Sequence, residues 1–294
     1  MSKIALREAR AGWSLAAPGL LLYLLFALLP VLVTMGFSVT EIDRFTWKTD
    51  FVGFDNFAYI WSDSHFWRSL VNTLEFIALA VTGNVGLGLL VAVLLDRALP
   101  KPLLYLLRFA YFLPVLVAAA LVSLVWKFLY STDLGILNYY LGALGVPGVG
   151  WLTDGRVAMV SVVIMDVWKH FGFFMIILLA ALQSVPRSLV EAAQIDGAGT
   201  PRIFWHIKLP AIAPVLLFCI TYATIGGLQV FDSVRILTNG GPGDATRVMV
   251  LYMYEQTFGM QDIGTGSAAA CTLLVIIMAV TAAQYGCGRR LARF

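Results

Sequence analysis

Five long stretches without Asp, Glu, Lys or Arg restrict the fold of this chain more than any other feature. They cover residues 11–40, 76–95, 109–126, 209–231 and 263–288. A helix needs roughly 20 mainly apolar residues to cross the hydrocarbon core of a bilayer. The sequence therefore predicts five membrane-spanning helices.

A sixth apolar stretch, about 157–182, is interrupted by Asp166, Lys169 and His170. Only 13% of all residues are charged, whereas soluble domains average about a quarter. We therefore expect an all-α membrane protein in which residues 1–294 form one domain. The expected spans are about 13–38, 70–95, 104–128, 157–182, 210–231 and 263–287.

The N-terminus has a second interpretation, because Lys3, Arg7 and Arg10 precede an apolar stretch, as in a secretory signal. That stretch is longer than the roughly 7 to 15 residues of a signal core, and no small-x-small cleavage site follows it. An uncleaved first span is favoured. The three cysteines show no paired spacing, so the sequence predicts neither a disulfide framework nor a metal site.

The distribution of Lys and Arg predicts the orientation. With six spans both termini share one side, which carries twelve Lys and Arg residues, whereas the opposite side carries seven. Cytoplasmic loops are enriched in positive residues. We therefore expect both termini, and the polar segment 187–210, in the cytoplasm.

Segment 187–210 has the signals of two short helices. Ser188 and Glu191 are spaced as a capping box, Gly197 suits a left-handed helix end, and Thr200-Pro201 suits a new helix start. Small residues around the turn would let another backbone approach closely. From the residues alone, a docking element and a well-capped loop on the membrane surface remain equally good interpretations.

A resemblance favours the docking element. The segment resembles the EAA loop of permease subunits in binding-protein-dependent ABC importers, through Glu191-Ala192-Ala193, Asp196-Gly197-Ala198, Phe204, Ile207, Leu209-Pro210 and Pro214. Further motifs, such as 52–57, Leu113-Pro114 and Gly240-Gly241-Pro242, are similar to those of the carbohydrate-uptake branch of this family. Of the two permeases in such importers, the chain resembles the first, as found in the maltose and glycerol-phosphate types, more than the second. The extra periplasmic domain of some maltose-type permeases has no counterpart here.

This resemblance implies the type I importer permease (MetI-like) fold, with a cytoplasmic coupling helix that transmits closure of ATPase subunits. The residues implied in coupling are Glu191, Ala192, Ala193, Asp196, Gly197 and Ala198. The implied location is a bacterial inner membrane. The implied partners are a second related permease in a heterodimer, two cytosolic ATPase subunits and an extracytoplasmic solute-binding protein. No nucleic acid is expected.

The chain has no GxxxxGK[ST] phosphate-binding loop. We therefore expect a permease subunit that is not itself an enzyme and that holds no cofactor. ATP and magnesium would bind to the partner ATPase subunits.

Polar residues within the spans are candidates for the solute path. Asp166, Lys169 and His170 share one helix face, where they either neutralise one another or contact solute. The other candidates are Asn84, Tyr222, Gln229 and Asp232. Each could instead hold helices together. Gly83, Gly86 and Gly88 are expected to allow close helix packing.

Three alternatives remain. The solute could be glycerol, glycerol-3-phosphate or another polyol derivative instead of a sugar. A gradient-driven secondary transporter would need more coupling charges within its spans and would not explain segment 187–210. An intramembrane enzyme would need a metal-binding or nucleophilic motif, and none lies within the spans.

Overall fold

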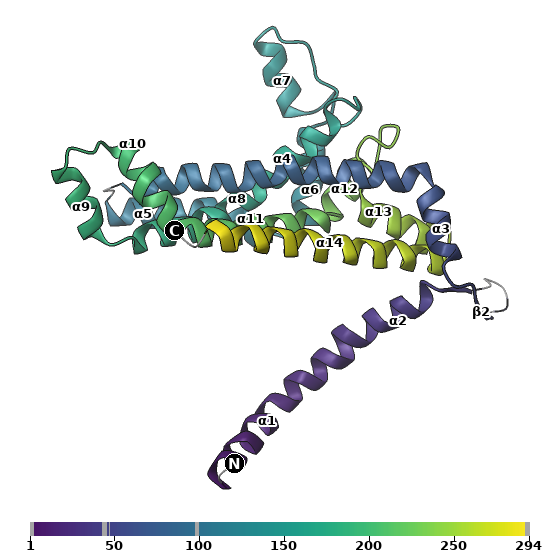
Figure 1. Cartoon of the computed structure of the whole chain (residues 1–294). Coiled ribbons are helices and arrows are strands. Elements are labelled where there is room, and N and C mark those ends of the chain that lie inside the picture. The colour runs from purple at the N-terminus through teal and green to yellow at the C-terminus, as the bar shows by residue number, and fades with distance from the viewer. Residues whose placement is uncertain (1–2, 43–45, 47, 98–99, 292–294) are drawn as a thin grey trace. The chain divides into compact units, whose positions relative to one another are not determined.

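The computed structural model describes residues 3–42, 46, 48–97 and 100–291, and these are mainly helical (Figure 1). The chain divides into two compact units. Unit 1 comprises Met1–Asp63 and Met253–Leu274, and unit 2 comprises Ser64–Tyr252 and Val275–Phe294.

Unit 1 begins with a long apolar helix made of α1 (Lys3–Tyr23), the π-helical turn η1 (Leu24–Leu28) and α2 (Leu29–Phe37). Pro30 has no N–H and cannot donate to the carbonyl of Phe26, four residues earlier. The wider turn η1 ends two residues before this proline and contains Phe26, where the regular hydrogen-bond ladder is interrupted. None of residues 12–37 is buried.

The rest of unit 1 is a short hairpin and a helix. Strands β1 (Thr40–Ile42) and β2 (Thr49–Phe51) pair antiparallel, with Glu41 opposite Asp50. Helix α3 (Asp55–Ser62) follows, and Asn56 Nδ2 donates to the carbonyl oxygens of Ser38 and Thr40. The unit also contains η4 (Glu255–Gly259) and the first half of α14 (Ile263–Leu291).

Unit 2 contains the helices that position the candidate sites. They are α4 (Ser64–Leu95), α5 (Lys101–Phe112), η2 (Leu113–Leu116), α6 (Ala119–Leu129), α7 (Ile136–Ala143), α8 (Ala158–Ser184), α9 (Arg187–Ile195), α10 (Thr200–Ile203), η3 (Phe204–Lys208), α11 (Leu209–Leu228), α12 (Asp232–Leu237) and α13 (Met249–Tyr254). The last two residues of α13 belong to unit 1. The second half of α14 belongs to unit 2. Helices α4 and α8 pack along each other, and α11 packs on both.

Glycines allow α4 and α8 to approach closely. A Cβ added at Gly88 would lie 2.9 Å from Phe174 Cβ and 3.0 Å from the backbone nitrogen of Met175, whereas a Cβ at Gly83 would meet Val167. The predicted packing role is therefore confirmed for Gly83 and Gly88. Gly86 differs, because a Cβ there would meet nothing within 4 Å.

The third predicted span is bent. Lys101–Leu116 and Ala119–Leu129 meet at 96° across a short break. Pro114 removes a backbone donor, and Val117 is extended, with φ −85° and ψ 138°, so the helix cannot continue. The sequence predicted one helix over about 104–128, because its apolar composition does not reveal the bend.

Two apolar cores hold unit 2 together. One includes Phe76, Tyr130, Val162 and Val234, and the other includes Val85, Leu178, Leu182 and Ile212. Helices α4 and α8 contribute to both cores, so they connect the two ends of the unit.

The described residues contain five helices long and apolar enough to cross a membrane, or up to six if the bent pair forms one span. The five are Gly12–Phe37, Ser64–Leu95, Ala158–Ser184, Thr200–Leu228 and Ile263–Gly288. This confirms the predicted class, an all-α chain with several apolar spans. The prediction that residues 1–294 form one domain stays a prediction.

Candidate coupling segment and solute cavity

The two helices predicted in segment 187–210 are present, but their N-caps lie two residues before Ser188 and one residue before Thr200, the predicted caps. Pro186 and Gly199 occupy the N-cap positions of α9 and α10, and neither side chain caps the helix. Ser188 and Thr200 lie within their helices. The predicted capping box and the predicted Thr200 cap are therefore wrong, because the backbone already adopts helical geometry before these hydroxyl groups.

The glycine turn between the helices is confirmed. Gly197 has φ +79°, which is in the left-handed region. The N–H of Ala198 donates to the Ala193 carbonyl at 2.9 Å, and the N–H of Gly197 donates to the Gln194 carbonyl at 3.0 Å. These two bonds form a Schellman motif, which satisfies carbonyl groups at the end of α9.

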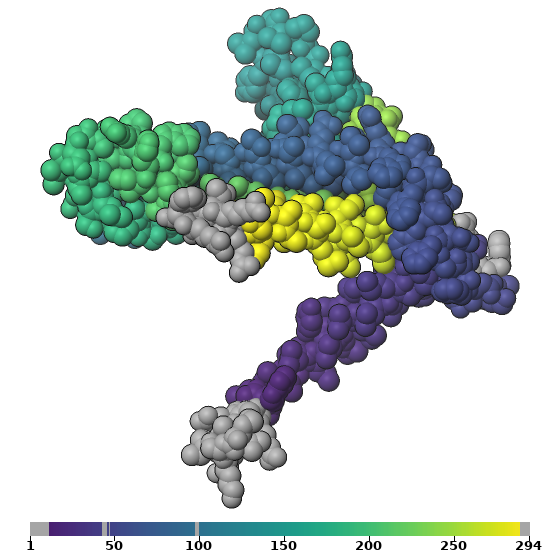
Figure 2. Space-filling view, in the orientation of Figure 1, coloured from purple at the N-terminus to yellow at the C-terminus, as the bar shows by residue number. Residues whose placement is uncertain are grey.

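Helix α9 has one packed face and one exposed face. Val190 packs against the core of unit 2. Glu191 is exposed. The apolar residues Leu189 and Ile195 are also exposed, with 53% of Leu189 and 86% of Ile195 accessible to solvent. Figure 2 shows that α9 and α10 form a projecting lobe at one end of unit 2. The lobe offers an apolar surface with a carboxylate beside it.

One polar contact attaches the end of this segment to a span, and another joins two spans just before the segment begins. Lys208 Nζ, at the end of η3, lies 2.5 Å from Asp96 Oδ2, directly after α4. Arg108 on α5 donates to Gln183 Oε1, near the end of α8, at 3.0 Å. A displacement of the lobe would therefore act on α4 through the Lys208–Asp96 pair.

A cavity of about 420 Å³ lies within unit 2. Its polar lining residues are Asn84, Asp166, His170, Tyr222 and Gln229. Phe76, Phe173 and Phe174 supply aromatic walls. Five of the seven residues predicted for the solute path are thus brought to one cavity, mostly by α4, α8 and α11.

Asp166 is the centre of the polar cluster. Asn84 Nδ2 donates to Asp166 Oδ2 at 2.9 Å, and His170 Nδ1 lies 3.1 Å from Asp166 Oδ1 and 3.0 Å from the Asp166 carbonyl oxygen. The Asp166 side chain is 14% exposed. The predicted contact between Asp166 and His170 on one helix face is therefore present.

Two predicted residues do not line the cavity. Lys169 is buried, and its Nζ donates to the Val115 carbonyl at 3.3 Å, so its bond is to the broken span and not to Asp166. Asp232 lies at the start of α12 and is exposed. Asp232 is not among the residues that line this cavity, and its predicted place in the solute path stays a prediction.

Sequence reasoning missed the aromatic wall and the Lys208–Asp96 pair. The ring of Phe173 on α8 and the ring of Tyr222 on α11 lie with their centroids 5.2 Å apart. Phenylalanine is common in any apolar span, so composition gives no signal for such a wall. The ion pair joins residues 112 positions apart, and only the fold brings them together.

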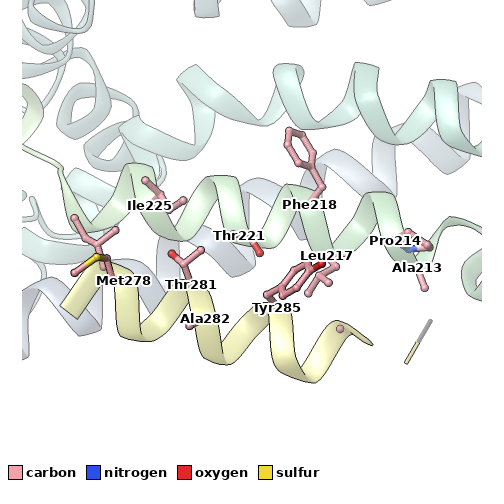
Figure 3. Close-up of a pocket in the computed structure, with 12 residues that line it drawn as sticks. Ala213, Pro214, Leu217, Phe218, Thr221, Ile225, Met278, Thr281, Ala282 and Tyr285 are labelled. Atoms are coloured by element: carbon pink, nitrogen blue, oxygen red, sulfur yellow. The ribbon is translucent and has the colours of Figure 1, made fainter. Parts of the chain in front are cut away.

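A larger groove of about 900 Å³ runs between α11 and the second half of α14 (Figure 3). It is mainly apolar, and its polar groups come from Thr221, Thr281 and Tyr285. A surface of this composition suits lipid chains or another apolar helix.

Comparisons with known proteins agree on one family. A family model described as a binding-protein-dependent transport system inner membrane component matches residues 84–293. The trehalose/maltose transport system permease protein MalF of Thermococcus litoralis is 35% identical over 98% of this chain and 97% of its own length. The sn-glycerol-3-phosphate transport system permease protein UgpA of Agrobacterium fabrum is 34% identical over 92% of each chain.

A solved structure supports the same fold. It is a chain of a bacterial ABC transporter involved in the import of the acidic polysaccharide alginate, with a TM-score of 0.84. It is 23% identical, and the match covers 98% of this chain and 99% of the other. At this identity the likeness shows the fold alone.

Proposed function

Because the chain belongs to the family of binding-protein-dependent transport system inner membrane components, we propose that it forms part of the pathway of an ATP-driven importer for a sugar or oligosaccharide. The observation that carries this proposal is the 35% identity, over nearly the whole chain, to a relative named for trehalose and maltose transport. The cavity in unit 2 supports it, because hydroxyl-rich solutes need hydrogen-bonding groups and aromatic faces.

A second solute class has a specific observation in its favour. Relatives named sn-glycerol-3-phosphate permeases are 32 to 34% identical over 92 to 97% of this chain. A polyol derivative is therefore the alternative substrate. A gradient-driven carrier or an intramembrane enzyme has no such support.

The proposed partners follow from the family. A solute-binding protein would deliver solute from outside, and a solved relative in this family of folds is in complex with an alginate-bound periplasmic protein. A second related permease would complete the pathway. Two cytosolic ATPase subunits would hold ATP and magnesium. The chain would lie in the inner membrane with both termini in the cytoplasm, as its Lys and Arg distribution predicts.

Coupling would use the exposed face of α9. Leu189 and Ile195 would insert into a cleft of an ATPase subunit, and Glu191 would contact polar groups at its edge. When the ATPase subunits close, the lobe would move as a rigid body. Through the Lys208–Asp96 pair this movement would reach α4, which lines the solute cavity.

The experiment compares Gly197→Ala and Gly197→Asp with Gly199→Ala in the reconstituted complex. An added Cβ meets nothing within 4 Å at Gly197 and only an ordinary contact at Gly199, so crowding is excluded. Only Gly197 is left-handed, and a side chain there costs roughly 1–2 kcal/mol. We expect both Gly197 variants to lower ATPase stimulation by loaded binding protein severalfold.

Gly199→Ala should keep most of the stimulation. A panel of sugars and polyols loaded onto the binding protein would identify the solute. Transport without any ATPase subunit, or equal activity in all variants, would contradict the proposed coupling.

A further inference from the structure

The cavity in unit 2 has an uneven set of hydrogen-bonding groups. Asn84 is 5% exposed, and its Oδ1 has no hydrogen-bond partner among the described residues. Its Nδ2 already donates to Asp166, so the orientation of the amide is fixed by that contact. An acceptor buried without a partner is unfavourable by about 1–3 kcal/mol.

The carboxylate of Asp166 adds further acceptor capacity at the same place. Oδ2 receives one donor from Asn84, whereas His170 Nδ1, with at most one proton, lies near both Oδ1 and the Asp166 carbonyl oxygen, and a carboxylate has about four acceptor positions. The polar end of the cavity therefore offers more acceptors than the protein fills. A solute bound there would have to bring hydrogen-bond donors.

Among the lining residues that the structure describes, none offers an unpaired cation to an anionic solute. The only ionisable lining groups in the described part of the cavity are Asp166, His170 and Tyr222. When His170 is protonated, its charge is already paired with Asp166 at 3.1 Å. The ammonium group of Lys169 is directed to the Val115 carbonyl. A phosphate or carboxylate would face a carboxylate without a counter-charge, which is strongly unfavourable in a partly dehydrated site.

We infer that this cavity takes a neutral, hydroxyl-bearing solute and excludes anions, with Asp166 and Asn84 as the residues that determine this specificity. The hydroxyl groups would donate to the Asp166 carboxylate, which Asn84 Nδ2 holds in place, and the apolar face of the solute would pack on Phe173 and Tyr222. The inference rests on the proposed role of the cavity in the solute path. It favours a sugar or free polyol over a phosphate ester.

The test measures the charge preference of the cavity without any transported solute. Gly226 lines the cavity, and a Cβ added there meets nothing within 4 Å, so Gly226→Cys introduces a thiol without crowding. Cys219, Cys271 and Cys287 would first be replaced by Ala. The full chain, purified with its partner subunits in detergent, would react with methanethiosulfonates of similar size that carry a hydroxyl, a sulfonate or an ammonium group.

We expect the sulfonate reagent to react slowest. Asp166→Asn should raise the sulfonate-to-hydroxyl rate ratio on the order of fivefold, as expected for removing one charge near a partly hydrated site, and should lower the ammonium-to-hydroxyl ratio. The control is a chain that retains only Cys287, which is exposed. Its rate ratios should not change with Asp166→Asn.

Three results would overturn the inference. The first is that Asp166→Asn leaves the rate ratios at the Gly226→Cys position unchanged. The second is that the sulfonate reagent reacts faster than the hydroxyl reagent, and the third is that the thiol reacts with none of the reagents. The measurement involves neither ATP nor transport. Failure of the importer proposal would appear instead as absent ATPase stimulation, with the thiol rates still dependent on Asp166.

Discussion

Lys208 and Asp96 form an ion pair, Nζ to Oδ2, that joins the end of η3 to the end of α4. Their side chains are 25% and 13% exposed, so solvent screens the pair only in part. At the other end of α4, Asn72 donates to carbonyl groups of the loop before α13. One helix therefore connects the proposed coupling segment with the opposite end of unit 2.

Neutralising either partner of this pair should weaken coupling. In Asp96→Asn or Lys208→Gln, the remaining charge lacks its counter-charge, and we expect a loss of about 1–3 kcal/mol in local stability. The number of solute molecules imported per ATP should fall severalfold. The double variant Asp96→Lys with Lys208→Asp restores an ion pair and should recover most of this ratio. If it behaves no better than the single variants, the pair does not act as a connection.

Gly88 should tolerate no side chain where α4 meets α8. Gly88→Ala would force Phe174 and the backbone near Met175 to shift, and overpacking of this kind costs about 1–3 kcal/mol. Gly86→Ala, on the same helix, is the matched control, because its Cβ enters open space. Thermal unfolding of the purified complex should show a lower midpoint only for Gly88→Ala. A shift of equal size in both variants would point to helix propensity.

Asn72 should hold the loop before α13 in place. Its Nδ2 donates to the carbonyl oxygens of Asp244 and Arg247 at 2.7 and 2.9 Å, and the residue is 2% exposed. Asn72→Asp replaces the donor with a carboxylate that would face two carbonyl oxygens, so we expect loss of several kcal/mol locally. Limited proteolysis should then cut within residues 239–247 at least tenfold faster. Asn138→Asp, in helix α7, should leave that rate unchanged.

The hydroxyl of Tyr130 should stabilise the contact between α6 and α8. It donates to the Ser161 carbonyl at 2.8 Å, and Tyr130 is 2% exposed. Tyr130→Phe should lower the free energy of unfolding by about 0.5–1.5 kcal/mol. Tyr139→Phe removes a hydroxyl from a side chain that is 74% exposed and should have no measurable effect. Chemical denaturation followed by tryptophan fluorescence would compare the two variants.

Local features could be predicted from the sequence where a few neighbouring residues decide them. Gly197 after a short helix predicts a left-handed turn, since glycine alone adopts that backbone without steric cost. The helix caps are harder to predict. The pattern favours Ser188 and Thr200, whereas the caps in the structure lie two and one residues earlier. Proline and glycine at Pro186 and Gly199 also start helices, and the local pattern does not distinguish these options.

The candidate cavity could be predicted only in part. Polar residues within apolar spans are few, so Asn84, Asp166, His170, Tyr222 and Gln229 could be selected from the sequence. Their partners could not. Lys169 lies next to Asp166 on the same helix, yet it bonds to Val115, because the bend after Pro114 places that carbonyl within reach.

Helix length, charge and glycine geometry are local properties, so the apolar helices and the polar, glycine-broken segment could be predicted from the sequence. Which residues meet depends on how the helices pack. Asn84 and Asp166 are 82 positions apart, and Asp96 and Lys208 are 112 positions apart. Such contacts depend on which helix faces pack together, and small residues such as Gly88 set that packing through close approach rather than through any pattern along the chain.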